Sequence, residues 1–240
     1  MVSLKSHIPN LLTCMNLLCG CLAVICALDA DSYLLIWATY LIWIAAIFDF
    51  LDGMTARWLK SYTELGKQLD SLADMVSFGL APGMILYALI KDEATIDKEW
   101  LAFFALAIPV FSALRLARFN IDDNQSDSFI GLPTPANALL IGSLPLLMLK
   151  GHAAIAELIG SPEVLAAIGV VLSLLLISGV GMFSLKVKSL KWKGNQLVYS
   201  FLLLAAVILF LFPYSALPII ILLYILISVT QSLLFNPKNS

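Results

Sequence analysis

The fold is decided by the stretch Tyr33–Ile90, which runs YLLIWATYLIWIAAIFDFLDGMTARWLKSYTELGKQLDSLADMVSFGLAPGMILYALI. It contains two long apolar runs, Tyr33–Trp58 and Gln68–Ile90, joined by a short polar segment. Each run is long enough for a membrane-spanning helix, which needs about 20 mostly apolar residues. Four aspartates lie where the runs meet, although each costs on the order of a few kcal/mol near the bilayer centre and less at its edge. The stretch predicts a helical membrane hairpin with an acidic cluster at its turn.

The whole chain has the composition of a membrane protein. Of its 240 residues, 61% are hydrophobic and 12% are charged, whereas soluble domains have roughly 45–50% and about 25%. The runs lack the period-two alternation of a membrane barrel, so we predict an all-α polytopic bundle of about eight transmembrane helices. The six further predicted spans are Leu11–Leu28, Leu101–Phe119, Pro133–Leu149, Pro162–Gly181, Gln196–Phe212 and Ser215–Leu234.

The basic residues predict the orientation of these spans. No cleavable signal peptide is evident, and we expect the first run to remain in the mature protein. With eight spans and a cytoplasmic N-terminus, eleven of the 14 basic residues lie inside, as the positive-inside rule requires. The inside set is Lys5, Arg57, Lys60, Lys67, Arg115, Arg118, Lys186, Lys188, Lys191, Lys193 and Lys238; the outside set is Lys91, Lys98 and Lys150. Both termini are therefore expected on the cytoplasmic side.

Helical geometry brings the four aspartates together. At 100° per residue, Asp49 and Asp52 share a face about 100° wide with the small residues Gly53 and Ala56, and Arg57 lies at its margin. On the next helix one side carries Gly66, Asp70 and Asp74. The connecting loop Lys60–Gly66 is short enough for the two helices to pack antiparallel. All four carboxylates are then expected at the cytoplasmic edge of the membrane.

Such a cluster of like charges requires either protonation or bound cations. Oxygen ligands suit Mg²⁺ or Mn²⁺, and a pair of metal ions held by carboxylates is well suited to displacement at phosphorus. Gly53 and Ala56 leave room for a substrate, and Arg57 can bind phosphate oxygens. The residues alone leave a second interpretation equally open, in which the carboxylates form a proton or ion pathway or join helices.

A resemblance favours the first interpretation. The spacing D-x-x-D-G-x-x-A-R, eight residues, then G-x-x-x-D-x-x-x-D resembles the signature of the CDP-alcohol phosphatidyltransferase family. Its fixed positions are Asp49, Asp52, Gly53, Ala56, Arg57, Gly66, Asp70 and Asp74. The stretches Leu69–Pro82, Ile8–Gly20, Ala113–Asn120 and Gly131–Ala138 further resemble the branch of the family that uses serine as the acceptor.

The resemblance implies a six-helix core and a reaction. A single domain would cover 1–240, with the core in 1–181, the catalytic hairpin in 49–74 and two additional helices in 182–240. Asp49, Asp52, Asp70 and Asp74 would hold two Mg²⁺ or Mn²⁺ ions, and Asp74 would also act as the base. CDP-diacylglycerol would donate its phosphatidyl group to L-serine, and CMP would leave. The donor would contact Gly53, Ala56, Arg57, Gly66, Asn10 and Thr13.

The predicted contacts with the donor from the first helix and the predicted contacts with serine each have a second interpretation. Asn10 and Thr13 either contact the donor or simply cap the start of the first helix. The serine carboxylate requires a cation, for which Arg118 is the first candidate, with Arg115 and Asn120 nearby. An ordinary role of Arg118 as a positive-inside anchor is equally compatible with the sequence.

The expected partners are membrane lipids, the two substrates, CMP and, by resemblance, a second copy in a homodimer; no nucleic acid is expected. The resemblance implies an integral protein of a prokaryotic cytoplasmic membrane with a cytoplasmic active site. One alternative is a sister transferase that uses glycerol 3-phosphate or inositol phosphate. A more remote alternative is an ion-coupled transporter, which often contains an internal repeat that this sequence lacks.

Overall fold

The structure is a computed structural model that describes residues 4–29, 32–121, 129–151, 153–183, 192 and 195–235. Five of the lysines assigned to the cytoplasmic side lie outside the described residues: Lys186, Lys188, Lys191, Lys193 and Lys238. Nearly all of the described chain is helical. The two exceptions among regular elements are short strands, β1 (Phe129–Ile130) and β2 (Gly181–Met182), which pair antiparallel. This pairing was not predicted from the sequence.

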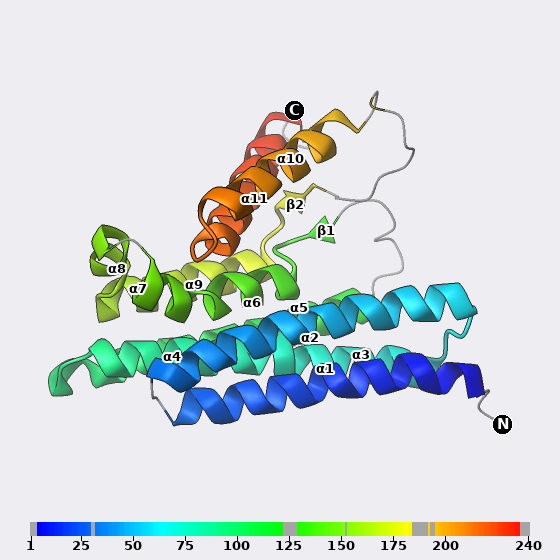
Figure 1. The fold of residues 1–240 in the computed structure, drawn as a ribbon, viewed down its shortest axis with the longest axis horizontal. Helices are drawn as coiled ribbons and strands as arrows, with labels where there is room; N and C mark the ends of the chain where they lie inside the picture. Colours follow the sequence, from blue (N-terminus) through cyan, green and yellow to red (C-terminus); the bar gives the residue numbers. More distant parts are fainter. Residues whose placement is uncertain are drawn as a thin grey trace.

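The first three long helices form a layer that carries the predicted hairpin (Figure 1). Helices α1 (Leu4–Leu28) and α2 (Ser32–Leu59) pack against each other along their length. The third helix is continuous from Glu64 to Glu93 but changes its winding along the way. It consists of α3 (Glu64–Asp74), a π-helix (Met75–Leu80, called η1) and α4 (Ala81–Glu93). The π-helix thus begins directly after the last aspartate of the motif.

The next helices pack on the other side of this third helix. A 3₁₀ helix, η2 (Ile96–Leu106), continues into α5 (Ala107–Ile121), which contacts η1. Two short helices, α6 (Thr134–Gly142) and α7 (Leu144–Lys150), lead to α8 (Ala153–Ile159) and α9 (Pro162–Ile177). Figure 1 shows α10 (Gln196–Leu211) and α11 (Ala216–Phe235) inclined to the long helices, above α6 and α9.

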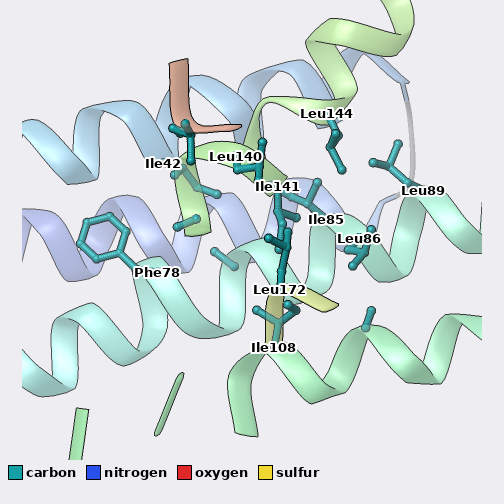
Figure 2. Packing of buried hydrophobic residues seen from close by; sticks show 14 of the residues in the cluster. Ile42, Phe78, Ile85, Leu86, Leu89, Ile108, Leu140, Ile141, Leu144 and Leu172 are labelled. Carbon is teal, nitrogen blue, oxygen red and sulfur yellow. The ribbon is translucent and has the colours of Figure 1, made fainter. Parts of the chain in front are cut away.

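One hydrophobic cluster holds these elements together (Figure 2). Phe78 of the π-helix and Ile85 of α4 are fully buried, and they join side chains from most of the neighbouring helices. These include Ile42 of α2, Ile108 of α5 and Ile141 of α6. The third helix is therefore the centre of the bundle, and the aspartates near its start are held by a packed scaffold.

The predicted count of eight spans is not confirmed, although the all-helical membrane architecture agrees with the structure. By length and apolar composition, five described helical segments can cross a membrane: His7–Leu28, Tyr33–Leu59, Glu64–Glu93, Ile96–Ile121 and Ala216–Leu234. A sixth is counted if α8 and α9, which are bent by 75°, form one span.

The remaining predicted spans are short or interrupted. The run Pro133–Leu149 is divided between α6 and α7 at Ser143. Pro145 follows this break, and its ring nitrogen cannot donate a hydrogen bond to the preceding turn. Helix α10 is apolar but has 16 residues, about 24 Å at 1.5 Å per residue. These departures explain why apolar composition overestimates the number of continuous long helices.

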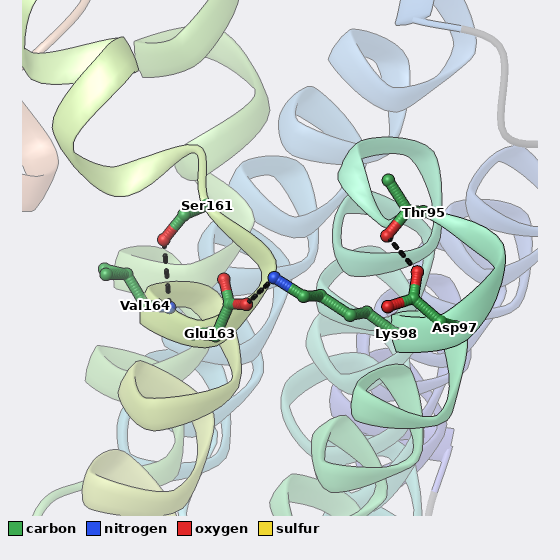
Figure 3. Close-up of polar contacts among 6 residues, drawn as sticks. All are labelled: Thr95, Asp97, Lys98, Ser161, Glu163 and Val164. Carbon is green, nitrogen blue, oxygen red and sulfur yellow. Dashed lines mark hydrogen bonds and ion pairs between the residues drawn. The ribbon is translucent and has the colours of Figure 1, made fainter.

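The end of the bundle opposite the aspartate hairpin carries an exposed polar cluster (Figure 3). Lys98 of η2 forms an ion pair of 2.6 Å with Glu163 of α9. Thr95 donates a hydrogen bond to Asp97 in the same turn, and the Ser161 hydroxyl caps α9 by accepting from the Val164 amide. The side chains of the ion pair are about half exposed, at 48% and 51%, so the pair contributes little to stability. Its exposed charges indicate that this end of the bundle lies outside the hydrocarbon core of the membrane.

Candidate active site

Three of the four predicted aspartates meet in the structure. One carboxylate oxygen from each of Asp49, Asp70 and Asp74 lies within 4.8 Å of the other two. Asp49 belongs to α2, whereas Asp70 and Asp74 lie one helical turn apart on α3. The antiparallel packing expected from the short connection is therefore present, and it brings the acidic side chains together.

The turn between α2 and α3 fixes this meeting point. It comprises Lys60–Thr63, and Lys60 adopts a left-handed φ of 50°, which reverses the chain at the end of α2. The amide of Ser61 donates to the carbonyl of Ala56 at 3.1 Å, which closes the end of the helix. Thr63 then caps α3, because its Oγ1 accepts from the Gly66 amide at 3.0 Å.

The fourth aspartate, Asp52, is held slightly apart by the first helix. It is 6% exposed, and its Oδ2 accepts a hydrogen bond of 2.6 Å from the Thr13 hydroxyl of α1. Asp52 and Asp70 line the same cavity. The Thr13 hydroxyl thus bonds a carboxylate of the acidic cluster, and its contact with the donor lipid stays a prediction.

This cavity, which we call the hairpin cavity, has a volume of about 560 Å³ and lies between α1, α2 and α3. It is lined by five of the six predicted donor-binding residues: Asn10, Thr13, Gly53, Ala56 and Gly66. A Cβ at Gly66 would lie 3.0 Å from Thr63 Oγ1 and 3.1 Å from Asn10 Oδ1. A Cβ at Gly53 would have no neighbour closer than 4.0 Å. Gly66 therefore permits close packing, whereas Gly53 leaves open space.

The sixth predicted donor residue, Arg57, is exposed and is not among the residues that line the cavity. Its guanidinium lies 4.0 Å from the position that a Cβ on Gly53 would occupy, so it lies close to one of the residues that line the cavity. Lys67 and Tyr62 also line the cavity, and the sequence analysis had not selected them. Lys67 could have been predicted from the sequence, because it directly follows Gly66 and so places a cation beside the motif.

A second contact from α1 holds the last aspartate. Asn16 is fully buried, and its Nδ2 donates a hydrogen bond of 3.1 Å to Asp74 Oδ1. The carbonyl of Asn16 accepts a hydrogen bond of 2.9 Å from the Ser77 hydroxyl of the π-helix. Sequence reasoning missed Asn16. Its position could have indicated a role, because residues three apart lie on nearly the same helix face and Asn16 follows Thr13 by three residues.

The carboxylate group fits a divalent cation. All of its ligands are oxygens, which hard cations prefer. The separation within 4.8 Å is close to the roughly 4 Å between opposite oxygens around one Mg²⁺. Asp70 Oδ1 is also buried and has no hydrogen-bond partner within the described part of the chain. A buried, unpaired oxygen in a residue whose carboxylate meets two further carboxylates is a feature that a bound cation would resolve.

A separate cavity lies between α5 and the end of α9, and we call it the arginine cavity. Its volume is about 410 Å³, and its polar lining includes Arg115, Arg118 and Ser178. Arg115 is 8% exposed, and its Nε is buried without a hydrogen-bond partner among the described residues. Its guanidinium interacts electrostatically with Asp74. Arg118 is exposed, and its NH1 donates a long hydrogen bond of 3.5 Å to the Ile177 carbonyl.

The predicted acceptor residues thus occupy different places. Arg115 and Arg118 line the arginine cavity, but Asn120 is not among its lining residues. Asn120 instead exchanges hydrogen bonds with Ser71 of α3, at 2.8 Å and 3.2 Å. Sequence reasoning also missed Asn137 of α6, which is fully buried with both amide atoms unpaired in the described structure. A burial pattern of this kind cannot be recognised without the fold.

The motif, the fold and the acidic site together define a class of membrane enzyme. The family model of the CDP-alcohol phosphatidyltransferases matches residues 6–175, which include the four aspartates and the two arginines of the arginine cavity. The chain belongs to the CDP-alcohol phosphatidyltransferase family.

Individual relatives are more specific. A CDP-diacylglycerol–serine O-phosphatidyltransferase of Helicobacter pylori is 34% identical over 97% of this chain and 96% of its own length. Proteins of the same name from Bacillus subtilis and Methanocaldococcus jannaschii are 35% and 37% identical. They match 54% and 56% of this chain, and 70% and 58% of their own lengths.

Proposed function

We propose that this membrane protein transfers the phosphatidyl group from CDP-diacylglycerol to the hydroxyl of L-serine and releases CMP. The strongest support is the acidic site, together with a relative that matches this chain over nearly its full length. That relative is the CDP-diacylglycerol–serine O-phosphatidyltransferase of Helicobacter pylori. The site offers oxygen ligands for a divalent cation, and Asp52 and Asp70 line the hairpin cavity. Arg115 of the arginine cavity interacts electrostatically with Asp74. A donor and an acceptor could therefore approach the same carboxylates from different sides.

The hairpin cavity is the proposed donor site. Its apolar and small residues leave space beside Gly53 and Ala56 for the nucleotide and diphosphate, and Asn10 supplies a polar contact. Arg57 and Lys67 would provide positive charge for phosphate oxygens. The exposed apolar surface of the surrounding helices leaves the lipid tails in the bilayer.

Asp49, Asp52, Asp70 and Asp74 are the proposed ligands of two divalent ions, Mg²⁺ or Mn²⁺, which would neutralise the diphosphate and polarise its phosphorus. Asp74 would accept the proton of the serine hydroxyl. The serine oxygen would form a bond to the phosphorus that carries diacylglycerol, and the bond from that phosphorus to CMP would break. Thr13 and Asn16 would keep the carboxylates of Asp52 and Asp74 oriented.

The arginine cavity is the proposed acceptor site. A serine carboxylate requires a cation in a site from which water is largely excluded. Arg115 meets this requirement better than Arg118, because it is nearly buried, its Nε is unpaired and it interacts electrostatically with Asp74. Arg118, the first choice from sequence, would then assist at the mouth of the cavity. Asn120 would act indirectly, through Ser71 on α3.

The finer architecture is also a proposal. The core would comprise 1–181 with six family helices, and 182–240 would add two more, for eight spans in all. This requires α6 with α7, and the 16-residue α10, to cross the bilayer as short or broken spans. The active site and both termini would face the cytoplasm of a prokaryotic cell, and two copies would form a homodimer.

The decisive experiment is an acceptor panel with the purified enzyme. CMP release from CDP-diacylglycerol is measured with L-serine, glycerol 3-phosphate, inositol phosphate or no acceptor, each with EDTA and after restoration of Mg²⁺ or Mn²⁺. We expect turnover with serine only, lost in EDTA and restored by either metal.

Two results would contradict the proposal. Turnover with glycerol 3-phosphate and none with serine would assign the chain to a sister activity of the same family. Full turnover in EDTA would show that the carboxylate cluster does not act through a metal ion. A chain that transports ions without releasing CMP from any acceptor would favour the remote transporter alternative.

A further inference from the structure

Helix α11 lies outside the part of the chain that the family model matches, yet it is attached to the wall of the arginine cavity. This wall includes Leu176–Ser178 at the end of α9, and the chain then continues into β2. Strand β2 is bound on one side to β1, with Phe129 opposite Met182 and Ile130 opposite Gly181. Its other attachments come from α11.

Three side chains of α11 make these attachments. The Ser232 hydroxyl accepts a hydrogen bond of 3.3 Å from the Gly181 amide, and the Ser228 hydroxyl accepts one of 3.4 Å from the Phe183 amide. The Tyr224 hydroxyl donates a hydrogen bond of 3.1 Å to the Phe183 carbonyl. Tyr224 and Ser228 are buried, at 8% and 0% exposure. Within the described residues, α11 therefore supplies β2 and the residue that follows it with hydrogen bonds beyond those of the β1 pairing.

Tyr224 also belongs to an aromatic cluster beside this attachment. Its ring packs against Phe183 at 4.8 Å and Phe201 of α10 at 6.2 Å between ring centroids. A packed aromatic cluster restricts where the chain at the end of β2 can move. Helices α10 and α11 therefore hold the segment that follows the wall of the arginine cavity.

We infer that α11 is a structural part of the acceptor site, in which Tyr224 is a positioning residue that fixes the Leu176–Ser178 wall beside Arg115 for the carboxylate of an amino-acid acceptor. The inference rests on the proposed function, because it assumes that the arginine cavity receives the acceptor. It assigns a role to one of the two helices beyond the family core. It also predicts that loss of the phenol affects the acceptor and spares the donor.

The test uses the full chain in lipid vesicles and compares Tyr224→Phe with the matched control Tyr199→Phe. Tyr199 lies on α10, where its ring stacks on Trp192 at 5.6 Å. For Tyr224→Phe we expect the KM for serine to rise about tenfold, as loss of roughly one buried hydrogen bond implies. The KM for CDP-diacylglycerol should change less than twofold, and the control should leave both constants unchanged.

A KM for serine that is unaltered in a folded Tyr224→Phe enzyme overturns the inference. If Tyr224→Phe unfolds, the double variant Ser228→Ala with Ser232→Ala replaces it, because it loosens β2 and retains the phenol. The same selective rise in the KM for serine is expected there, and its absence again overturns the inference.

Arg115→Lys separates this inference from the proposed function. If Arg115→Lys also leaves the KM for serine unaltered, the arginine cavity is not the acceptor site, and the proposed location fails. If Arg115→Lys raises that KM while Tyr224→Phe does not, the location stands and only the role of α11 is refuted.

Discussion

At the scale of single residues, the site depends on how three helices orient carboxylates. Asp49 and Asp74 reach the cluster from different helices, and α1 contributes no acid but binds two of the acids through Thr13 and Asn16. Such contacts fix which oxygen of a carboxylate faces a cation, and their loss typically costs 10–100-fold in metal affinity or activity, as an order of magnitude. The first helix is therefore as much a part of the site as the motif.

Asp74→Asn tests the proposed base. The amide keeps the size of the side chain but cannot accept the serine proton, so kcat should fall by about 10²–10⁴-fold. Binding of CDP-diacylglycerol, measured by isothermal titration, should persist. Asp92→Asn, on the exposed end of α4, is the matched control and should retain full activity. Turnover near the wild-type rate in Asp74→Asn would exclude this residue as the base.

Asn16→Ala tests the support of Asp74. The substitution removes the amide that donates to Asp74 Oδ1, so kcat should fall by about 10- to 100-fold and the Mg²⁺ concentration for half-maximal activity should rise. Cys21→Ala, at an exposed position of the same helix, should change neither quantity. A lower kcat with an unchanged metal requirement would show that Asn16 does not act through the metal site.

The sequence predicted the acids but not their supports, for a physical reason. Carboxylates in an apolar run are conspicuous because they are costly there, and their spacing places them on one helix face. A neutral amide such as that of Asn16 costs less in an apolar run than a carboxylate does. It is therefore less conspicuous in the sequence, and its role becomes clear only when its partner Asp74 is known. The same holds for Tyr224 and Asn137. Arg118 and Arg115 could be ranked only when burial showed which of them is unpaired.

At the scale of helices, the close approach of α1 to the π-helix carries the site. A Cβ on Gly20 would lie 2.4 Å from Ser77 Oγ, 2.8 Å from Ser77 Cα and 2.9 Å from its amide nitrogen. Because two of these atoms are backbone, no side-chain movement could relieve the overlap. Small residues allow membrane helices to approach in this way. Gly20 thus keeps Asn16 within hydrogen-bonding distance of Asp74.

Gly20→Ala should separate the two helices. We expect a loss of about 1–3 kcal/mol in stability, as overpacking of a close contact typically costs, together with a reduced kcat. Gly179→Ala is the control, because a Cβ at that position has no neighbour within 4 Å among the described residues other than the adjacent ones in the chain. Thermal unfolding in detergent and activity measure the two effects. Unchanged stability of Gly20→Ala would mean that the helices approach less closely than the structure indicates.

Helix positions were predicted more successfully than helix continuity. Apolar composition located every long helix, because a lipid-facing surface must be apolar along its whole length. It could not show that Ser143 and Pro145 divide one run, or that six residues after Asp74 adopt π winding. Those features depend on individual hydrogen bonds. The pairing of β1 with β2 was missed because two-residue strands have no detectable periodicity.

At the scale of the whole molecule, the hairpin cavity and the exposed ion pair lie at opposite ends of the bundle. The α2–α3 turn lies at one end and the α4–η2 turn at the other (Figure 1). The hairpin cavity adjoins the first of these ends, together with Arg57 and Lys67. The ion pair between Lys98 and Glu163 lies at the second (Figure 3). The proposed cytoplasmic location of the active site places the first of these ends inside the cell and the second outside.

Single-cysteine labelling tests that orientation. In a background with the four native cysteines replaced by alanine, Tyr62→Cys in the α2–α3 turn should react with a membrane-impermeant maleimide only from the cytoplasmic side. Asp97→Cys, at the opposite end, should react only from the outer side. Inverted membrane vesicles and intact cells supply the two exposures. Labelling of both positions from one side would contradict the proposed topology.

The π winding between α3 and α4 limits how this protein can change during evolution. A segment with a wider turn holds one residue more than an α-helix of the same span. Deleting a single residue from Met75–Leu80 should therefore restore α winding and leave α4 nearly in place. A deletion elsewhere in α3 or α4, with no change of winding to absorb it, would rotate one part of the helix by about 100° relative to the other. The apolar face that contains Ile85 would then turn away from its neighbours, or the aspartates would turn away from theirs. Changes of length in this helix should therefore be confined to Met75–Leu80.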